Sequence, residues 1–148
     1  MEKDKLTQEV LSVLIETATY GSGWLDYQFD RTQVPLIENE AGCDTVARIL
    51  LAGGEVEFID HWAEEPDEIY SETGYFESDA GIYPVTLEDI VKGLEKAESG
   101  EWNAYDEETR KIVKEDVADL MNGVDETCLD LDAADCIMQV ILFNETVY

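Results

Sequence analysis

The amino-acid sequence predicts an α+β domain in which a small antiparallel or mixed sheet packs against about five helices. Helical periodicity of apolar residues recurs along the chain, and short alternating segments lie between the first helices. Apolar residues make up 45% of the 148 residues, which is enough to build a core. Because this length is typical of one domain, we expect residues 1–148 to form a single acidic domain.

The first half of the chain is predicted to alternate helix and strand. Thr7 is the expected cap of the first helix, and Asp44 is the expected cap of the second. Glycines directly after each helical pattern are expected to end it. The predicted elements are a helix over 6–20, an aromatic-rich strand over 24–30, a helix over 44–52 and a half-buried strand over 55–60.

The second half is predicted to be mostly helical after a long polar segment. Residues 61–82 form either a loop or a loop that carries a short hairpin near its end. A capping-box pattern from Thr86 to Asp89 marks the start of the next helix. The predicted helices cover 86–97, 106–122 and 132–143, which completes the α+β pattern.

The charge is the most unusual property of the sequence. Thirty-six Asp and Glu face nine Lys and Arg, for a formal net charge of −27. Ionised carboxylates are almost never buried unpaired, so most must lie on the surface. Such a surface repels nucleic acid and anionic membranes and attracts basic proteins. The sequence therefore predicts a basic protein surface as partner, with no direct contact to nucleic acid or membrane.

The acidic residues are concentrated in two blocks. Residues 32–91 hold fifteen acids and one base, and residues 115–148 hold nine acids and no base. The intervening 92–114 holds six acids and five bases, and 1–31 holds six acids and three bases. A general solubility device gives no reason for this segregation, so we expect an acidic binding face.

The cysteines and the first residues predict a location in the cytoplasm. Cys43, Cys128 and Cys136 are odd in number and lack CxxC spacing, which favours a reducing compartment. The N-terminal residues lack the apolar stretch of a signal peptide, and no run is long enough for a membrane span.

The sequence contains no motif that indicates catalysis, and we expect that the protein is not an enzyme. His61 is the single histidine, and no nucleophile motif surrounds a Ser or Cys. The acids at 64–68 and 130–135 do not follow the EF-hand pattern, and no P-loop is present. A carboxylate pair for glycoside hydrolysis cannot be singled out among so many acids. We therefore expect no metal and no cofactor.

A segment of aromatic and acidic residues is the predicted partner-binding site. Aromatic side chains can anchor an interface, and carboxylates around them can steer a basic partner. The alternative is that the rings close the open face of the sheet beneath a solvated loop. The predicted binding residues are Glu55, Glu57, Asp60, Trp62, Glu64, Glu65, Asp67, Glu68, Tyr70, Glu72, Tyr75, Phe76, Glu77 and Asp79. A secondary acidic face is predicted at Asp116, Asp119, Asp125, Glu126 and Asp130.

In size and charge the chain resembles small phage and mobile-element inhibitors that mimic DNA. The C-terminal residues 130–148 (DLDAADCIMQVILFNETVY) and the upstream 85–93 (VTLEDIVKG) are also similar to small acidic proteins of unassigned function. Those proteins are encoded in phages and mobile elements of low-GC Gram-positive bacteria. The first resemblance implies an inhibitor of a restriction or CRISPR effector, which would be bound through its nucleic-acid-binding surface. The second implies a mobile-element origin.

Three hypotheses follow from the sequence. The first is a DNA-mimic inhibitor, which requires carboxylates along one continuous face. The second is an acidic accessory or regulatory protein that binds a basic partner without mimicry. An apolar groove or self-complementary patch would favour this hypothesis. The third is a small enzyme or ligand-binding domain with incidental acidity, which requires a deep polar pocket. A homodimer is left open.

Overall fold

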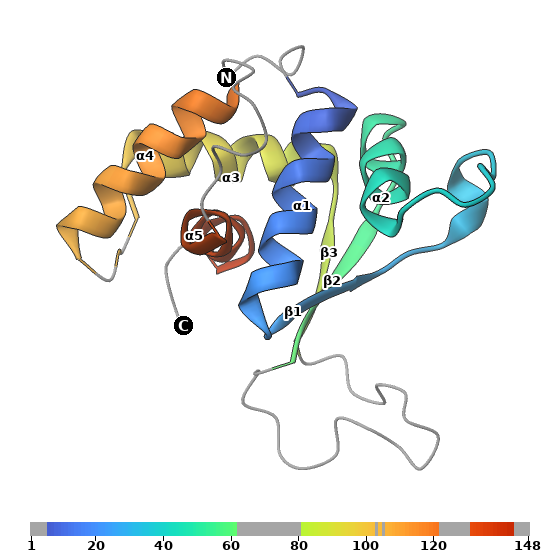
Figure 1. The fold of residues 1–148 in the computed structure, drawn as a ribbon, viewed down its shortest axis with the longest axis horizontal. Helices are drawn as coiled ribbons and strands as arrows, with labels where there is room; N and C mark the ends of the chain where they lie inside the picture. Colours follow the sequence, from blue (N-terminus) through green and yellow to red (C-terminus); the bar gives the residue numbers. More distant parts are fainter. Residues whose placement is uncertain (1–5, 62–80, 103, 105, 122–130, 144–148) are drawn as a thin grey trace.

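The fold is α+β, as predicted. The computed structural model describes residues 6–61, 81–102, 104, 106–121 and 131–143 (Figure 1). The elements in these ranges are α1 (Gln8–Ser22), β1 (Leu25–Gln28), the 3₁₀ turn η2 (Arg31–Gln33), α2 (Gly42–Leu51), β2 (Val56–Asp60), β3 (Ile82–Val85), α3 (Leu87–Ser99), α4 (Glu107–Met121) and α5 (Leu131–Phe143).

The described strands form one antiparallel sheet in the order β1-β2-β3. Phe58 at the centre of β2 is paired with Tyr27 of β1 and with Tyr83 of β3. The short hairpin expected around Tyr70 to Tyr83 lies mostly outside the described residues, and its last two positions, Ile82 and Tyr83, belong to β3, which pairs with β2. Most of the predicted loop, residues 62–80, lies outside the described residues.

Helix capping agrees with the sequence at two positions and differs at one. The Thr7 side chain accepts a hydrogen bond from the backbone N–H of Val10, and the backbone N–H of Thr86 donates to the Asp89 carboxylate at 2.9 Å. The predicted cap at Asp44 is wrong, because α2 begins two residues earlier, after Ala41. Asp44 lies in the first turn, and its carboxylate accepts a hydrogen bond from α1 instead.

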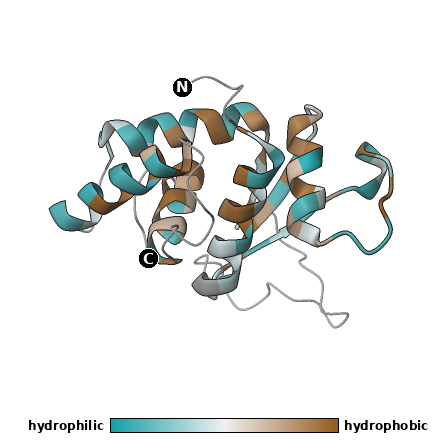
Figure 2. Ribbon diagram, turned by 45° about the horizontal axis from the view of Figure 1, so that its top comes forward, coloured by the Kyte–Doolittle hydropathy of each residue, from teal (hydrophilic) through white to brown (hydrophobic). Residues whose placement is uncertain are grey.

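The helices form a layered arrangement around one hydrophobic core. Helix α1 lies between α2 and α5, while α3 and α4 pack against α5 and each other (Figure 1). Figure 2 shows hydrophilic and hydrophobic positions alternating along the helices, as expected where each helix buries part of its surface. One cluster of buried side chains joins these helices to the sheet. No helix in the described ranges has the length and apolar character needed to span a bilayer.

A buried polar contact connects the start of the sheet to α5. The fully buried Trp24 donates from Nε1 to Asp135 Oδ1 at 2.8 Å. Gln139 lies one helical turn after Asp135 and is also buried, and its Nε2 donates to the same oxygen at 2.9 Å. Because buried polar groups are costly when unpaired, these bonds fix how α5 sits against the strand region.

Gly93 allows α3 and α5 to approach closely. A Cβ at this position would overlap Ile141 Cγ1 and come within 2.8 Å of the Ile141 Cα. The backbone of α5 would have to move to make room for it.

We expect Gly93→Ala to destabilise the fold by about 1–3 kcal/mol, because overpacking displaces a packed helix backbone. The free energy of unfolding in urea measures this. Glu98→Ala, on the exposed side of the same helix, is the control and should change stability by no more than about 0.5 kcal/mol. Equal effects of the two substitutions would contradict the close approach.

Candidate protein-interaction surface

The described members of the predicted binding site have different environments. Glu55 is exposed just before β2, and Glu57 is half-buried in β2, where its carboxylate accepts a hydrogen bond from Gln28 at 3.2 Å. Asp60 is only 2% exposed, so its side chain is not part of the surface. Strand alternation explains this burial, because Asp60 lies on the same side of β2 as Val56 and Phe58.

The remaining predicted partner-binding residues lie outside the described residues. They are Trp62, Glu64, Glu65, Asp67, Glu68, Tyr70, Glu72, Tyr75, Phe76, Glu77 and Asp79. The same holds for Asp125, Glu126 and Asp130 of the predicted secondary face. For these positions the sequence prediction stays a prediction.

The described members of the two predicted faces do not lie together. Asp116 and Asp119 are on α4, which packs against α3 and α5. Glu55 and Glu57 belong to the sheet region, on the other side of α1 in Figure 1. A partner would therefore have to extend across the helices to contact both sets.

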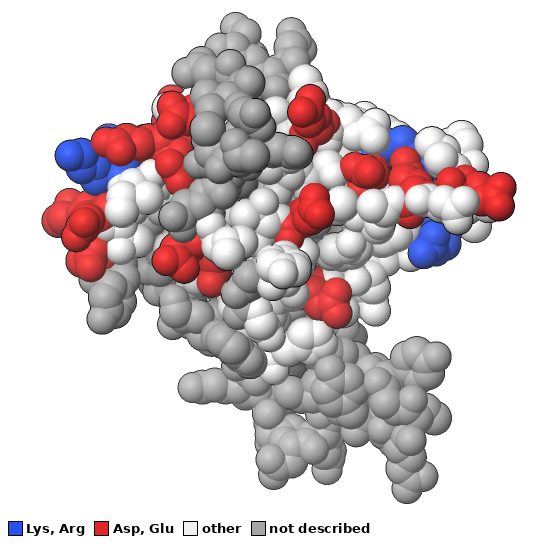
Figure 3. Space-filling view, in the orientation of Figure 1, with Lys and Arg blue, Asp and Glu red and all other residues white. Residues whose placement is uncertain are grey.

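Exposed carboxylates occur on several elements. On the face drawn in Figure 3 they gather over α4 at one side and over the η2–α2 connection at the other, with scattered groups between. Uncharged surface separates these groups in the described part of that face. The exposed carboxylates of these two regions include Asp30, Glu38, Glu107, Glu108, Glu115 and Asp119.

The η2–α2 connection, residues 34–41, carries an exposed apolar tip that we did not predict from the sequence. Leu36 is 79% exposed and Ile37 is 49% exposed, between Pro35 and Glu38. Val34, just before them, packs partly against the core. The signal was present in the run Val34-Pro35-Leu36-Ile37, which is apolar yet fits no helix or strand pattern.

Arg48 holds this connection on the side facing α2. Its guanidinium donates to both oxygens of Glu40 and, at 2.7 Å, to the backbone carbonyl of Pro35. The hydroxyl of Thr45 also donates to Glu40, at 2.7 Å. Bonds from Arg48 and Thr45 hold the pKa of the Glu40 carboxyl below its usual range. Arg48, the single Lys or Arg of residues 32–91, therefore stabilises the conformation of this connection.

A second clamp joins the start of the connection to the sheet. The Gln33 side chain donates to the carbonyl of Glu55 at 3.0 Å and accepts from the Glu55 backbone N–H at 3.0 Å. Just before it, the Asp30 carboxylate accepts from the hydroxyl and the backbone N–H of Thr32. These two bonds lower the pKa of Asp30. Gln33 thus holds the chain before the tip, and Arg48 holds the two sides of the tip at Pro35 and Glu40.

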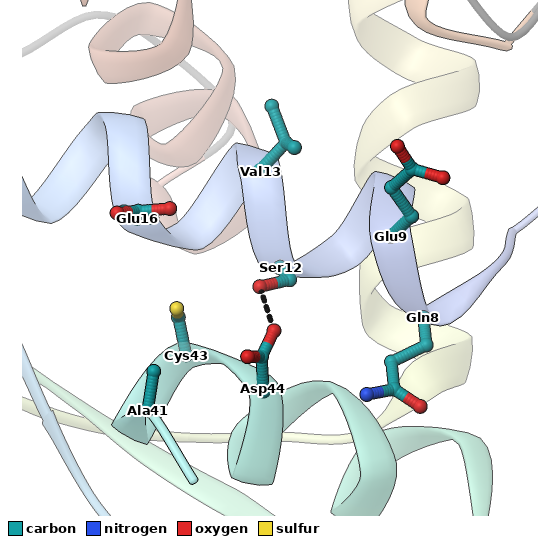
Figure 4. A pocket seen from close by; sticks show the side chains of 8 residues that line it. All are labelled: Gln8, Glu9, Ser12, Val13, Glu16, Ala41, Cys43 and Asp44. Carbon is teal, nitrogen blue, oxygen red and sulfur yellow. Dashed lines mark hydrogen bonds between the residues drawn. The ribbon is translucent and has the colours of Figure 1, made fainter.

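The hollow shown in Figure 4 lies between α1 and the start of α2 and has a volume of about 560 Å³. Ser12 Oγ donates to Asp44 Oδ1 at 2.5 Å, which ties the two helices together. Glu9 and Glu16 contribute further carboxylates to the wall. The hydroxyl proton of Ser12 faces a carboxylate with no histidine in the wall, so the catalytic pattern of serine, histidine and acid is not formed here.

Of the other reactive side chains, the thiol of Cys43 also lines this hollow, whereas His61 does not. The imidazole of His61 lies 3.5 Å from the Asp26 carboxylate, at the end of the sheet. Cys43 is a free thiol, Cys136 is half-buried on α5, and Cys128 lies outside the described residues. Among the described residues, no group of three or more His, Cys, Asp or Glu side chains could hold a metal ion.

Comparisons with protein families, with curated proteins and with solved structures found no match to this chain. What the protein does must therefore be argued from its own surface.

We expect Arg48→Ala to destabilise the protein at neutral pH, and we expect this loss to shrink as the pH falls. The lowered pKa of Glu40 means that the ion pair stabilises the fold above the ordinary carboxyl pKa of about 4.3. That contribution is lost as the pH falls through the pKa of the folded state. Urea unfolding of both proteins at neutral and acidic pH measures the difference.

Lys92→Ala is the matched control, because Lys92 and Glu88 form an exposed pair whose charged atoms are 3.9 Å apart. Exposed pairs contribute little to stability, so this substitution should have a small effect at both pH values. A loss for Arg48→Ala that is equally large at acidic pH would show that the ion pair is not its cause.

Proposed function

We propose that this protein is an acidic binding protein that occupies a basic surface of a nucleic-acid-binding protein. By doing so it would inhibit a host defence protein such as a restriction or CRISPR effector. The observation that carries the proposal is the surplus of carboxylates. Nine Lys and Arg can neutralise at most a quarter of the thirty-six acids. Exposed acids such as Glu9, Asp26 and Glu38 leave this surplus in contact with solvent.

The sign and density of the charge support this class of partner. Duplex DNA carries about one negative charge per 1.7 Å of its axis, and the proteins that bind it present matching basic grooves. A surface rich in carboxylates is attracted to the same grooves and is repelled by DNA itself. Competition with nucleic acid for one protein surface is the expected consequence.

The exposed tip at Leu36 and Ile37 favours a second candidate, an acidic accessory or regulatory protein that binds its basic partner without mimicry. Mimicry of a phosphate backbone requires charge alone, whereas exposed apolar side chains gain from meeting apolar surface. The two candidates differ in whether duplex DNA displaces the protein from its partner.

The test begins with the immobilised protein and a lysate of a low-GC Gram-positive bacterium at low salt. Proteins that are released at high salt are identified, and each is purified and bound to labelled duplex DNA. We expect the acidic protein to displace the DNA, as measured by fluorescence anisotropy, because both ligands need the same basic surface. Purified partners whose DNA complexes persist in excess acidic protein would contradict the inhibitor proposal and support the accessory role.

The contribution of the 32–91 block is tested with two variants of equal charge change. One is Glu38→Gln/Glu55→Gln/Glu57→Gln, and the other is Glu9→Gln/Glu16→Gln/Asp26→Asn in 1–31. We expect the first to weaken binding to the purified partner by about 10-fold more than the second, because the concentrated block carries more of the contact. Equal losses would contradict a dedicated face and indicate diffuse charge attraction.

A further inference from the structure

We propose that residues 35–38 form a preformed apolar anchor, which inserts into an apolar pocket bordered by basic side chains on the partner. This inference rests on the proposed function in one respect, namely that the partner surface is basic. It adds that affinity and specificity come from Leu36 and Ile37 as well as from charge.

The side chains of Leu36 and Ile37 are unusually exposed for aliphatic residues. The described cluster of buried residues includes most of the large aliphatic side chains, whereas Leu36 is 79% exposed and Ile37 is 49% exposed. Two adjacent aliphatic side chains at the tip of a projecting segment form a small apolar patch that a complementary pocket can cover. In Figure 1 this connection extends away from the body beside α2.

Hydrogen bonds from Arg48 hold the tip in one shape. Arg48 joins the Pro35 carbonyl to the Glu40 carboxylate, so the two ends of the tip are fixed by one guanidinium. A turn closes between them, with the Glu40 N–H donating to the Ile37 carbonyl at 3.3 Å. Asn39 has a φ of 63°, a left-handed conformation that few residues other than glycine adopt.

Fixing a binding segment before association lowers the entropy lost when the complex forms. The Gln33 clamp to Glu55 adds to this by anchoring the segment to the sheet. An exposed segment that needed only to connect η2 to α2 would not require two side-chain clamps. The clamps therefore suit a segment that presents its tip to a partner.

The charges beside the tip indicate the chemistry of the partner. Glu38 directly follows Leu36 and Ile37 in the chain. The side chain of Gln33 donates hydrogen bonds to the backbone carbonyls of Asp30 and Glu55, and both of these acidic residues are exposed. Lys and Arg around an apolar pocket would complement this arrangement. A second copy of the chain would bring another net charge of −27 to the contact, which strongly opposes self-association.

The test uses two fluorescein-labelled peptides of equal length and equal Lys and Arg content. One has Gly and Ser at its other positions, and the second has Leu and Trp at its centre. We expect the wild-type protein to bind the peptide with Leu and Trp about 10-fold more tightly or better. In Leu36→Ser/Ile37→Ser this preference should disappear, while affinity for the Gly and Ser peptide stays unchanged.

Two further variants distinguish binding by Leu36 and Ile37 from nonspecific binding by other exposed apolar side chains. Tyr20→Ser/Leu51→Ser removes exposed apolar side chains elsewhere and should keep the preference. Arg48→Ala keeps Leu36 and Ile37 but removes the hydrogen bonds that hold the tip. It should weaken binding of the Leu and Trp peptide and leave binding of the Gly and Ser peptide unchanged. Circular dichroism checks that each variant is folded.

Equal affinity of the wild type for both peptides would overturn the anchor while leaving the acidic binding function in place. A preference that survives Leu36→Ser/Ile37→Ser would also overturn it. If neither peptide binds at low salt, the proposed function fails together with the anchor.

Discussion

The structure depends on keeping most of its described carboxylates in water while every described α-helix contributes to one core. Among the described residues, several buried or half-buried polar side chains are paired: Asp135 accepts from both Trp24 and Gln139, and Ser12 donates to Asp44. The acids are thereby left on the outer sides of the helices, where their mutual repulsion opposes folding. A surface of this kind gains free energy from any partner or salt that supplies positive charge.

Arg48 shows how the scarce bases are used. It is the only base in 32–91, yet it pairs with Glu40 and the Pro35 carbonyl instead of offsetting the exposed acids around it. Its charge is thus used to shape a short connection with an apolar tip. The result places rigid apolar side chains inside an acidic region, a combination suited to a basic surface with an apolar pocket.

The fold was predictable because apolar periodicity and capping patterns are local signals. Thr7 and the Thr86–Asp89 box mark helix starts that the structure confirms. Asp44 is not the cap because α2 begins at Gly42, and its carboxylate bonds instead to Ser12, a residue distant in sequence. Strand alternation could have assigned Asp60 to the interior. The clamped tip at Leu36 was not predictable, since it depends on Arg48 and Gln33 reaching across the fold.

The most direct test of this account measures two free energies in one salt series. Screening should raise the free energy of unfolding of the protein alone, because it relieves repulsion among the carboxylates. The same screening should weaken binding to the purified basic partner, because it removes the attraction. Opposite slopes against salt concentration are the predicted result. A stability and an affinity that both stay constant as salt rises would contradict the claim that unneutralised surface carboxylates govern folding and binding.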